Sequence, residues 1–436
     1  MNRNLIATAL AVACVWAPVG AAHADADQRQ DGTARAACAA ARSVDAVVTC
    51  ALAVSPEVAE ARAQVDAAEG RRATASVVLP SNPTVSAVIA QRRRQEAPTR
   101  VPNWSVSVAQ ELELAGQRGA RMDQADAERD ARAARLRVVQ QEVAAGALAA
   151  YYEAIAAREA LAFATDLSAT ARALAEYAEG RAKEELVAGV EADVARAEAT
   201  RIGVVRFEAE RHLAEAVAVL ALLLDVPAAQ LDLPPALPRG ATVAPDAEAL
   251  AERALRLRGE VAAAQAEQRV LERRLSVVRR ERAPNPTLSL FAERGEVNDR
   301  IYGVGLSFPI PLPAPVGRTR AGEIAETLAQ LRAAESSREL VRRRVRAEVA
   351  RAVAAQRAKT AEADLFAADL VARARVGLAS LREALAARRL TLREGLQWQR
   401  SLIELLSAEI DVRLARLTTD LELRRVAGLP LTGGVK

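Results

Sequence analysis

Hydrophobic and polar positions follow two periods along this chain, and the shorter period occurs in two separate regions. Apolar and polar residues alternate in the run from Trp104 to Leu114, which begins WSVSV, and apolar residues again stand at every second position from Tyr302 to Leu312. Such alternation predicts β-strands with one apolar and one polar face. Each run is preceded by a further apolar segment across a polar loop. We therefore expect two strand pairs, 84–94/103–114 and 287–293/301–312.

The second period is helical. No proline occurs in residues 117–226 or 316–429, although the chain contains 18, and both stretches are dense in Ala, Arg, Glu and Leu. These residue types lose little conformational freedom in a helix. A single helix over 117–183 would be about 100 Å long. We expect two long helical hairpins, one over 117–224 and one over 317–426, entered at Gly116 and Gly317.

The chain is internally duplicated. Three pairs of short motifs recur at the same separation of 203 residues, which is the mark of a repeated structural unit. The pairs are Glu57-Val58-Ala59 with Glu260-Val261-Ala262, Asn82-Pro83-Thr84 with Asn285-Pro286-Thr287, and Asp225-Val226-Pro227 with Gly428-Leu429-Pro430. We expect a first repeat at 25–227, a Pro-rich linker at 228–245, a second repeat at 246–430 and a tail at 431–436.

The N-terminus predicts export. Residues 1–24 combine Arg3, an apolar run and Ala22-His23-Ala24, which is the arrangement of a signal peptide. The residues before Cys14 lack the Leu that is usual in a lipoprotein box, so the sequence leaves open whether Cys14 is lipidated. Of the two mature cysteines, Cys38 and Cys50, export favours a disulfide; the alternative is two unpaired small apolar residues. After the signal peptide, no apolar run approaches the ~20 residues of a spanning helix.

Candidate catalytic chemistry is missing from the sequence. The chain has two histidines, and His212 stands alone once the signal peptide is removed. We find no metal-ligand spacing of His, Cys and carboxylate residues, no nucleophile with a base and no phosphate-binding loop. We therefore expect no enzyme activity, no cofactor and no bound metal. The 60 basic and 56 acidic residues are interleaved along helices, which favours pairing on helix faces over nucleic-acid binding.

Four strands are too few to close a barrel, and an open sheet edge in lipid is costly. If the strands enter a membrane, two or more chains must share one barrel, and three chains would supply twelve strands. The alternatives are a soluble hairpin lying on the helices and a purely structural coiled coil. Trp104 and Tyr302 begin their strands on the loop side, where interfacial aromatic residues would lie; a core role is the competing interpretation. Near the first loop, Arg92, Arg93, Arg94 and Arg100 suggest contact with anionic lipopolysaccharide.

These features together resemble the TolC-type outer-membrane efflux factors, nearest to the heavy-metal efflux (CzcC-like) branch. The resemblance covers nearly everything from Ser43 to Leu431 and depends on the order of several motifs and on the 203-residue repeat. The motifs are Ser55-Pro56-Glu57-Val58, Asn82-Pro83, Gln110-Glu111-Leu112-Glu113-Leu114-Ala115-Gly116-Gln117-Arg118, Ala188-Gly189-Val190-Glu191-Ala192-Asp193-Val194, Pro309-Ile310-Pro311-Leu312 and Ala427-Gly428-Leu429-Pro430. The second tip, from Arg389 to Arg393, is more basic than the family pattern.

The resemblance implies a mainly α fold with a small β part, in which each protomer adds four transmembrane strands to a 12-stranded β-barrel in a homotrimer. The helical hairpins would form an α-barrel tunnel through the periplasm. The protein would be the passive exit duct of a tripartite efflux system, with a periplasmic adaptor and an inner-membrane transporter of the resistance–nodulation–division (RND) type. Metal ions and drugs are the expected cargo; a type I protein secretion outlet is the alternative.

Charged residues crowd the two hairpin tips of the predicted tunnel. We expect acids of one hairpin to pair with arginines of the next and close the periplasmic end, although a solvated charged turn would have the same composition. The candidate tip residues are Glu184, Glu185, Glu191, Asp193, Arg388, Arg389 and Arg393.

Overall fold

A computed structural model describes most of the chain. The described residues are 38, 43–93, 100–238, 246–294, 299–312, 315–317, 319–366, 368–387 and 391–431. Several predictions lie outside these residues, namely the signal peptide 1–24 with Cys14, residues Arg94, Arg388 and Arg389, part of the linker and most of the tail.

The described chain is mainly helical with one small antiparallel sheet, which confirms that part of the predicted fold class. The helices are α2 (Val44–Val54), α3 (Pro56–Ala75), α4 (Gln117–Lys183), α5 (Gly189–Leu224), η1 (Ala228–Gln230), α6 (Ala247–Leu257), α7 (Gly259–Arg280), α8 (Ala321–Asp364), α9 (Ala368–Ala386) and α10 (Leu392–Val426). The strands are β1 (Thr84–Arg93), β2 (Arg100–Glu111), β3 (Thr287–Arg294) and β4 (Arg300–Ser307).

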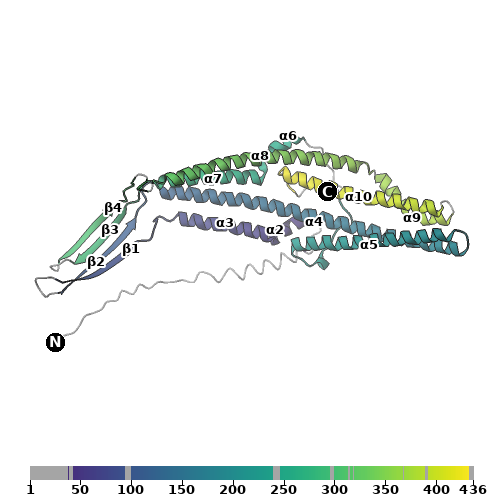
Figure 1. The fold of residues 1–436 in the computed structure, drawn as a ribbon, viewed down its shortest axis with the longest axis horizontal. Helices are drawn as coiled ribbons and strands as arrows, with labels where there is room; N and C mark the ends of the chain where they lie inside the picture. Colours follow the sequence, from purple (N-terminus) through teal and green to yellow (C-terminus); the bar gives the residue numbers. More distant parts are fainter. Residues whose placement is uncertain are drawn as a thin grey trace, which may run out of the picture.

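The molecule is elongated, with the sheet at one end and the helical hairpins running away from it (Figure 1). Helix α4 packs against α3, α5 and α7, and α8 packs against α7 and α10. The adjoining ends of α4 and α5 and those of α9 and α10 lie together at the end of the molecule opposite the sheet. The fold therefore separates two candidate functional regions, the sheet and the hairpin tips.

Residues with a left-handed backbone conformation lie at the ends of helices in both repeats. Gly116 precedes α4 with a φ of 71°, which glycine adopts without steric cost. Asp225 and Gly428, which are 203 positions apart, follow α5 and α10 with φ angles of 50° and 65°. The start of the second helical hairpin differs from the expectation. The residue that precedes α8 is Arg320, with a φ of 57°, and not Gly317.

The second long helix is interrupted, whereas α4 runs unbroken for 67 residues. Helix α8 ends at Asp364 and α9 begins at Ala368. At this end, the amides of Leu365 and Phe366 donate to carbonyls three residues earlier, which tightens the last turn. Phe366 packs beside a buried cluster of α9 and α10 side chains. The predicted continuous rod in the second repeat is therefore replaced by two helices.

The four strands form one sheet in the order β1-β2-β3-β4, with every neighbouring pair antiparallel. The central β2–β3 pairing joins the first repeat to the second. Strand β4 ends at Ser307, five residues before the predicted end at Leu312. Pro309 and Pro311 follow this end, and proline has no amide hydrogen to donate to a neighbouring strand.

The largest hydrophobic core lies where the two hairpins meet, about half-way along the helices. Side chains from α2, α4, α5 and α10 contribute to it, together with part of the linker. Its largest fully buried members are Leu148, Ile155, Leu220, Leu224 and Val47. This core holds the two repeats together midway between the sheet and the tips.

Candidate functional site

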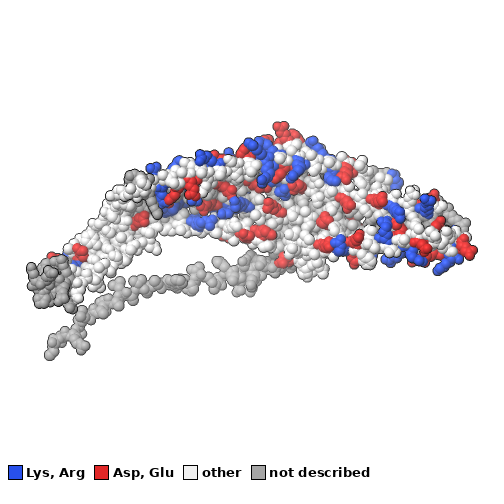
Figure 2. Space-filling view, viewed as in Figure 1, with Lys and Arg blue, Asp and Glu red and all other residues white. Residues whose placement is uncertain are grey.

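One face of the sheet is continuously apolar. The register places Val85, Ala87 and Ile89 of β1 opposite Val108, Val106 and Trp104 of β2. The same face continues across β3 and β4 with Leu288, Leu290, Ala292, Tyr302, Val304 and Leu306. Nearly all the large members of this face are exposed to solvent in the single chain. Figure 2 shows almost no charged side chain over this part of the molecule, in contrast to the helices.

The opposite face carries mostly small and polar residues, with Val88, Phe291 and Ile301 among them. The hydroxyls of Ser86 and Ser107 lie 3.2 Å apart across β1 and β2. On β3 and β4, Phe291 lies over Gly303, where an added Cβ would collide with the ring. Glycine at this position therefore leaves space for the aromatic ring, as in other sheets where an aromatic covers a glycine. The sheet is thus amphipathic, with an apolar face and a face compatible with water.

The predicted interfacial aromatics lie on the apolar face toward the loop end of the sheet. Trp104 is opposite Ile89 on one side and Arg294 on the other. Tyr302 is opposite Ala292 and is 72% exposed. Neither ring belongs to a buried core cluster of the described residues. The role of both rings at a membrane–water boundary stays a prediction.

In the part of the chain that the structure describes, both edges of the sheet lack a strand partner. Within the described residues, β1 pairs only with β2 and β4 pairs only with β3. Their outer backbone groups are therefore available to another chain. An amphipathic sheet with two available edges is compatible with closure by neighbouring copies.

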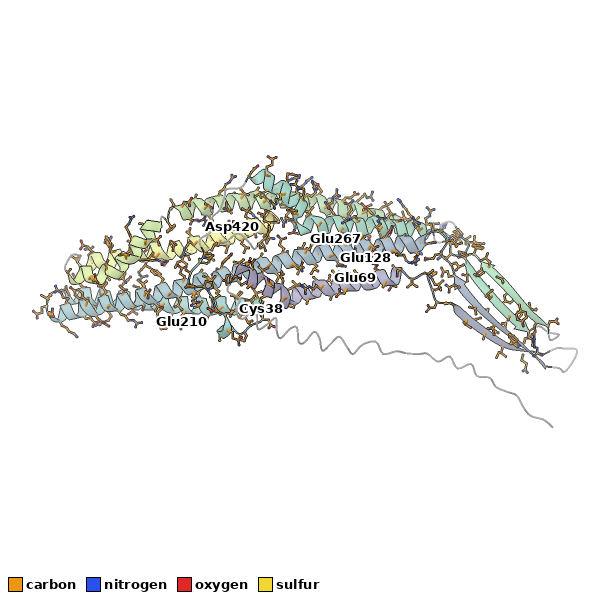
Figure 3. All side chains as sticks on the ribbon, turned by 180° about the vertical axis from the view of Figure 1, so that it is seen from behind. Cys38, Glu69, Glu128, Glu210, Glu267 and Asp420 are labelled. Carbon is orange, nitrogen blue, oxygen red and sulfur yellow. A yellow bond between two sulfur atoms is a disulfide. The ribbon has the colours of Figure 1, made fainter. Side chains whose placement is uncertain are left out.

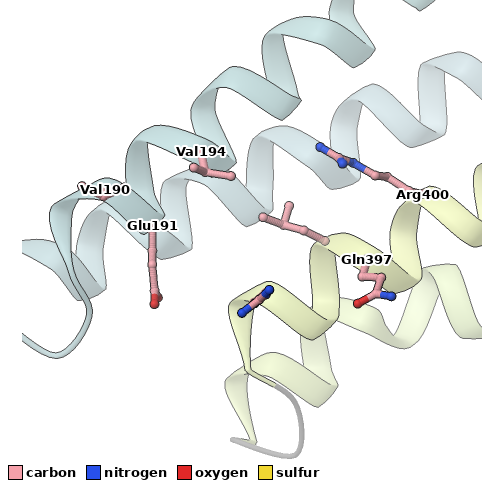
Figure 4. Close-up of a pocket in the computed structure, with 7 residues that line it drawn as sticks. Val190, Glu191, Val194, Gln397 and Arg400 are labelled. Carbon is pink, nitrogen blue, oxygen red and sulfur yellow. The ribbon is translucent and has the colours of Figure 1, made fainter.

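At the tips, residues of α5 and α10 line a groove of about 550 Å³. Glu191 and Val194 come from α5, and Arg393, Gln397 and Arg400 come from α10. Figure 4 shows Glu191 pointing from α5 into the space between the two helices. The groove therefore brings one predicted acid and one predicted arginine together within a single chain.

The remaining tip candidates are distributed around the first turn. Glu184 follows the last residue of α4, and Glu185 adopts a left-handed φ of 59°; both are exposed. Asp193 pairs weakly with Arg196 of the same helix at 3.8 Å. These three acids are not brought to the groove in the single chain.

Sequence reasoning missed a buried ionic contact close to this groove. Glu198 of α5 is 4% exposed and accepts hydrogen bonds from Arg201 of the same helix and from Arg400 of α10, at 2.6 and 2.9 Å. The Arg201 hydrogen bond, together with that from Arg400, lowers the pKa of Glu198 to about 2 and outweighs the opposing effect of burial. No local motif indicates the contact with Arg400, because Glu198 and Arg400 are 202 residues apart.

A second missed contact centres on Glu159 of α4. Its carboxylate contacts Arg413 of α10 at 2.5 Å and Arg375 of α9 at 3.4 Å. It also accepts a hydrogen bond from the amide of Leu237 in the linker, at 3.2 Å. One nearly buried carboxylate thus connects the first repeat, the linker and the second repeat.

Cys38 and Cys50 form a disulfide, with sulfurs 2.14 Å apart and Cα atoms 5.4 Å apart. Both residues belong to the large core at the junction of α2, α4 and α5, where Figure 3 labels Cys38. The disulfide attaches the segment before α2 to the helical body.

No group of three or more His, Cys, Asp or Glu residues in the described ranges could hold a metal ion. Among the helices described here, none has an apolar stretch long enough to cross a membrane.

Comparison with known families identifies the first repeat. Residues 47–224 match the family described as Outer membrane efflux protein. This segment is similar to outer membrane efflux proteins. The match begins within α2, includes strands β1 and β2, and ends at the last residue of α5. The family places the protein in the outer membrane, and its members are transport channels rather than enzymes.

Solved structures extend the similarity to most of the chain. The structure of CusC, reported in work on transmembrane channel formation, aligns with a TM-score of 0.72 at 15% identity, over 89% of this chain and 92% of that one. The outer membrane channel CmeC of Campylobacter jejuni gives 0.71 at 13% identity, over 88% and 85%. The outer membrane protein VceC of Vibrio cholerae gives 0.70 at 16% identity, over 89% and 97%. At these identities, the likeness concerns the fold. No curated protein matches the chain.

Proposed function

We propose that this outer membrane efflux protein is the passive exit channel of a tripartite efflux system. Three copies close a 12-stranded barrel, in which the apolar face of each sheet contacts lipid and the small, polar face lines the pore. The long hairpins continue below as a periplasmic tunnel. A periplasmic adaptor binds the tips, and an inner-membrane transporter of the RND type supplies the energy.

The amphipathic sheet with two available edges carries this proposal. Each strand has 8 to 12 residues, close to the length that crosses a bilayer when tilted. An open edge in lipid would leave backbone groups without hydrogen bonds, at a cost of several kcal/mol each. Pairing β4 of one copy with β1 of the next removes every edge.

Cross-linking between β4 of one copy and β1 of the next tests whether neighbouring copies close the barrel. Thr84 lies in β1 and Ser307 in β4, so a Thr84→Cys/Ser307→Cys variant treated with a flexible bis-maleimide should give covalent dimers and trimers. The matched control is Ala109→Cys/Ser289→Cys, whose positions face each other within one chain. It should remain monomeric on a denaturing gel. Equal oligomer formation by the two variants, or none by the first, would contradict shared closure.

Cargo requires a cellular test. We propose metal-ion or organic-drug efflux, with the heavy-metal branch as the first choice because of the sequence resemblance. A deletion strain should become more sensitive to divalent metals, and expression of the wild-type chain should restore growth. Sensitivity to drugs alone would exclude metal cargo. Loss of a secreted protein without any change in sensitivity would indicate a secretion outlet.

We also propose that the tips form a reversible latch. Glu191 and Arg393 line the same groove, so charge pairs between neighbouring hairpins, involving Glu184, Glu185 and Asp193 with Arg388 and Arg389, would extend this arrangement around the tunnel. Exposed pairs contribute less than about 1 kcal/mol each, which is compatible with reversible opening.

Single-channel recording decides between a latch and a solvated charged turn. Arg393→Glu should increase the open fraction, and Glu191→Arg/Arg393→Glu should restore closure. The control, Arg343→Glu, changes an exposed arginine of α8 outside the groove. If the Arg393→Glu channel opens as often as the wild type, the latch hypothesis is wrong.

A further inference from the structure

Four helices lie side by side in the half of the molecule nearest the sheet, in the order α3, α4, α7 and α8 (Figure 1). Figure 3 shows three of them from behind, with Glu69, Glu128 and Glu267 labelled on α3, α4 and α7. Within the described residues, α3 packs mainly on α4, and α8 packs on α7, α6 and α10. Helices α3 and α8 therefore occupy the two outer sides of this row, and both keep exposed residues along their length.

The internal duplication relates the contacts of this row to one another. Helix α7 is the counterpart of α3, because Glu57-Val58-Ala59 of α3 and Glu260-Val261-Ala262 of α7 are 203 residues apart. Helix α8 is the counterpart of α4, because Gly116 and Arg320, which precede these helices with left-handed φ angles, are 204 residues apart. In a ring of copies, the contact of α4 with α7 would thus have an equivalent that joins α8 of one copy to α3 of the next.

The contact of α4 with α7 shows which levels of the two helices would meet. Gly259 of α7 lies against Val138 of α4, where an added Cβ would collide with the valine side chain. Nearer the sheet, Arg273 of α7 and Asp123 of α4 form an ion pair at 3.0 Å. These two contacts fix the level at which the equivalent pair of helices would pack.

Shifted by the repeat separations, these levels place residues 56–70 of α3 antiparallel to residues 327–342 of α8. The exposed side of α3 in this range consists of small residues, which are Ala63, Ala67 and Gly70. The facing side of α8 carries large apolar residues, which are Leu328 and Leu331. Ala67 would lie at the level of Leu331. Small residues opposite large ones allow two helices to approach closely, so the two sides are complementary in shape.

The same two sides are complementary in charge. Glu60 is exposed, and its carboxylate accepts a hydrogen bond from Gln64 of the same helix at 3.3 Å. At the facing level of α8, Arg338 and Arg342 are one turn apart and half-buried. Arg343 pairs with an acid of its own helix, whereas Arg338 and Arg342 form no ion pair within the described residues. One acid of α3 would thus meet two arginines that lack a carboxylate partner.

We propose that α3 of one copy packs against α8 of the next, with Glu60 between Arg338 and Arg342 and with Ala67 against Leu331. The contact continues the shared β1–β4 edge from the barrel into the helical body, and it repeats between copies the packing of α4 on α7 within one chain. This inference rests on the proposed channel, because it requires copies arranged in a ring.

Cross-linking tests which sides of the helices meet. The full-length Ala67→Cys/Leu331→Cys variant in membranes, oxidised with copper phenanthroline, should give disulfide-linked dimers and trimers on a non-reducing gel. The matched control is Ala67→Cys/Leu340→Cys. Leu340 is also exposed on α8, but it lies nine residues from Leu331 and therefore on the opposite side of the helix. The control should remain monomeric, and equal cross-linking of the two variants would overturn the proposed contact.

Charge reversal tests the pairing of Glu60. Like charges brought together at an interface oppose association, so Glu60→Arg should lower the fraction of trimer in mild detergent at least about tenfold. Arg338→Glu/Arg342→Glu should have the same effect, and the variant that combines all three substitutions should recover the trimer. The control, Glu69→Arg, reverses an exposed acid on the other side of α3 and should assemble as the wild type does. If the combined variant does not recover, the pairing is wrong.

Native mass spectrometry and conductance separate failure of this inference from failure of the channel proposal. A trimeric, conducting wild type, together with no cross-link between positions 67 and 331, would overturn the contact and leave the channel intact. A wild type that neither assembles nor conducts would overturn the channel and, with it, this inference. A cross-link at these positions with full assembly of both charge variants would reject the pairing of Glu60.

Discussion

Glu198 of α5 and Arg400 of α10 form an ion pair between the two repeats, with Oε2 and Nη2 2.9 Å apart. Glu198 is almost fully buried, whereas Arg400 is largely exposed. Arg201 completes the contact from the same helix as Glu198. The pair lies beside the tip groove, where Arg400 is one of the lining residues. It therefore couples the tip of the first hairpin to that of the second.

Acid should weaken this contact. The pKa of Glu198 is lowered from its ordinary value of 4.5 to about 2, so the ionised form is stabilised by folding. A lowered pKa gives stability that is fully present above about pH 4.5 and is lost as the pH falls toward 2. We expect Glu198→Gln to cost about 1.5–3 kcal/mol at pH 7 and nearly nothing at pH 2. Denaturation midpoints of both proteins across this range give the difference.

The control for this measurement is Glu210→Gln. Glu210 pairs with Arg206 on the exposed surface of α5 at 3.4 Å. Its loss should change stability by less than about 1 kcal/mol at any pH. If the two variants show the same pH profile, the stabilising role assigned to Glu198 is wrong.

Removing the charge of Glu159 should loosen the second repeat from the first. Arg413 is largely buried beside Glu159, and its charge would lose one of its two carboxylate partners. Because Arg413 keeps Glu409 as a partner, the cost should be smaller than the ~3–5 kcal/mol of leaving a buried charge unpaired. Glu159→Gln should therefore lower the unfolding midpoint and increase hydrogen exchange in α9 and α10. Glu153→Gln, which affects an exposed contact with His212, should leave both unchanged.

Local patterns predicted the elements better than the contacts between them. Ser55 begins the motif Ser55-Pro56-Glu57-Val58, in which serine and proline are typical of a helix start, and its Oγ accepts a hydrogen bond from the amide of Val58 at 3.2 Å. The alternation around Trp104 predicted a strand because each side chain's face is decided by its own position. The helix α4 followed from the absence of proline and the density of helix-forming residues. Such signals lie within a few neighbouring residues.

Other features depend on residues that are distant in the sequence. The contact of Glu198 with Arg400 joins positions 202 apart, and neither has a distinctive neighbour. The end of α8 near Phe366 has no nearby glycine or proline to indicate it. It depends on packing against α9 and α10. The sequence places the tip charges at their turns, but the groove shared by Glu191 and Arg393 exists only once the hairpins pack together.

Loss of the disulfide should destabilise the helical body. Cys38 and Cys50 are both buried, so their link constrains the unfolded chain and joins a packed core. We expect Cys38→Ser/Cys50→Ser to lose about 2–4 kcal/mol. A reducing agent should lower the melting temperature of the wild type toward that of the variant. The variant itself should not respond to the reducing agent, and a response would reveal another reducible site.

Charge on the apolar face of the sheet should prevent membrane insertion. Val106 and Ser107 are neighbours in β2, but their side chains lie on opposite faces, and Val106 belongs to the face that would contact lipid. A lysine on the lipid-facing side of a barrel costs about 2–4 kcal/mol near the middle of the bilayer, whereas a residue facing the pore stays hydrated. Because assembly would place three copies in one barrel, Val106→Lys incurs this cost three times. We expect Val106→Lys to be lost from outer-membrane fractions and Ser107→Lys to insert and conduct with altered ion selectivity. If Val106→Lys inserts as well as Ser107→Lys, the assignment of the apolar face to lipid is incorrect.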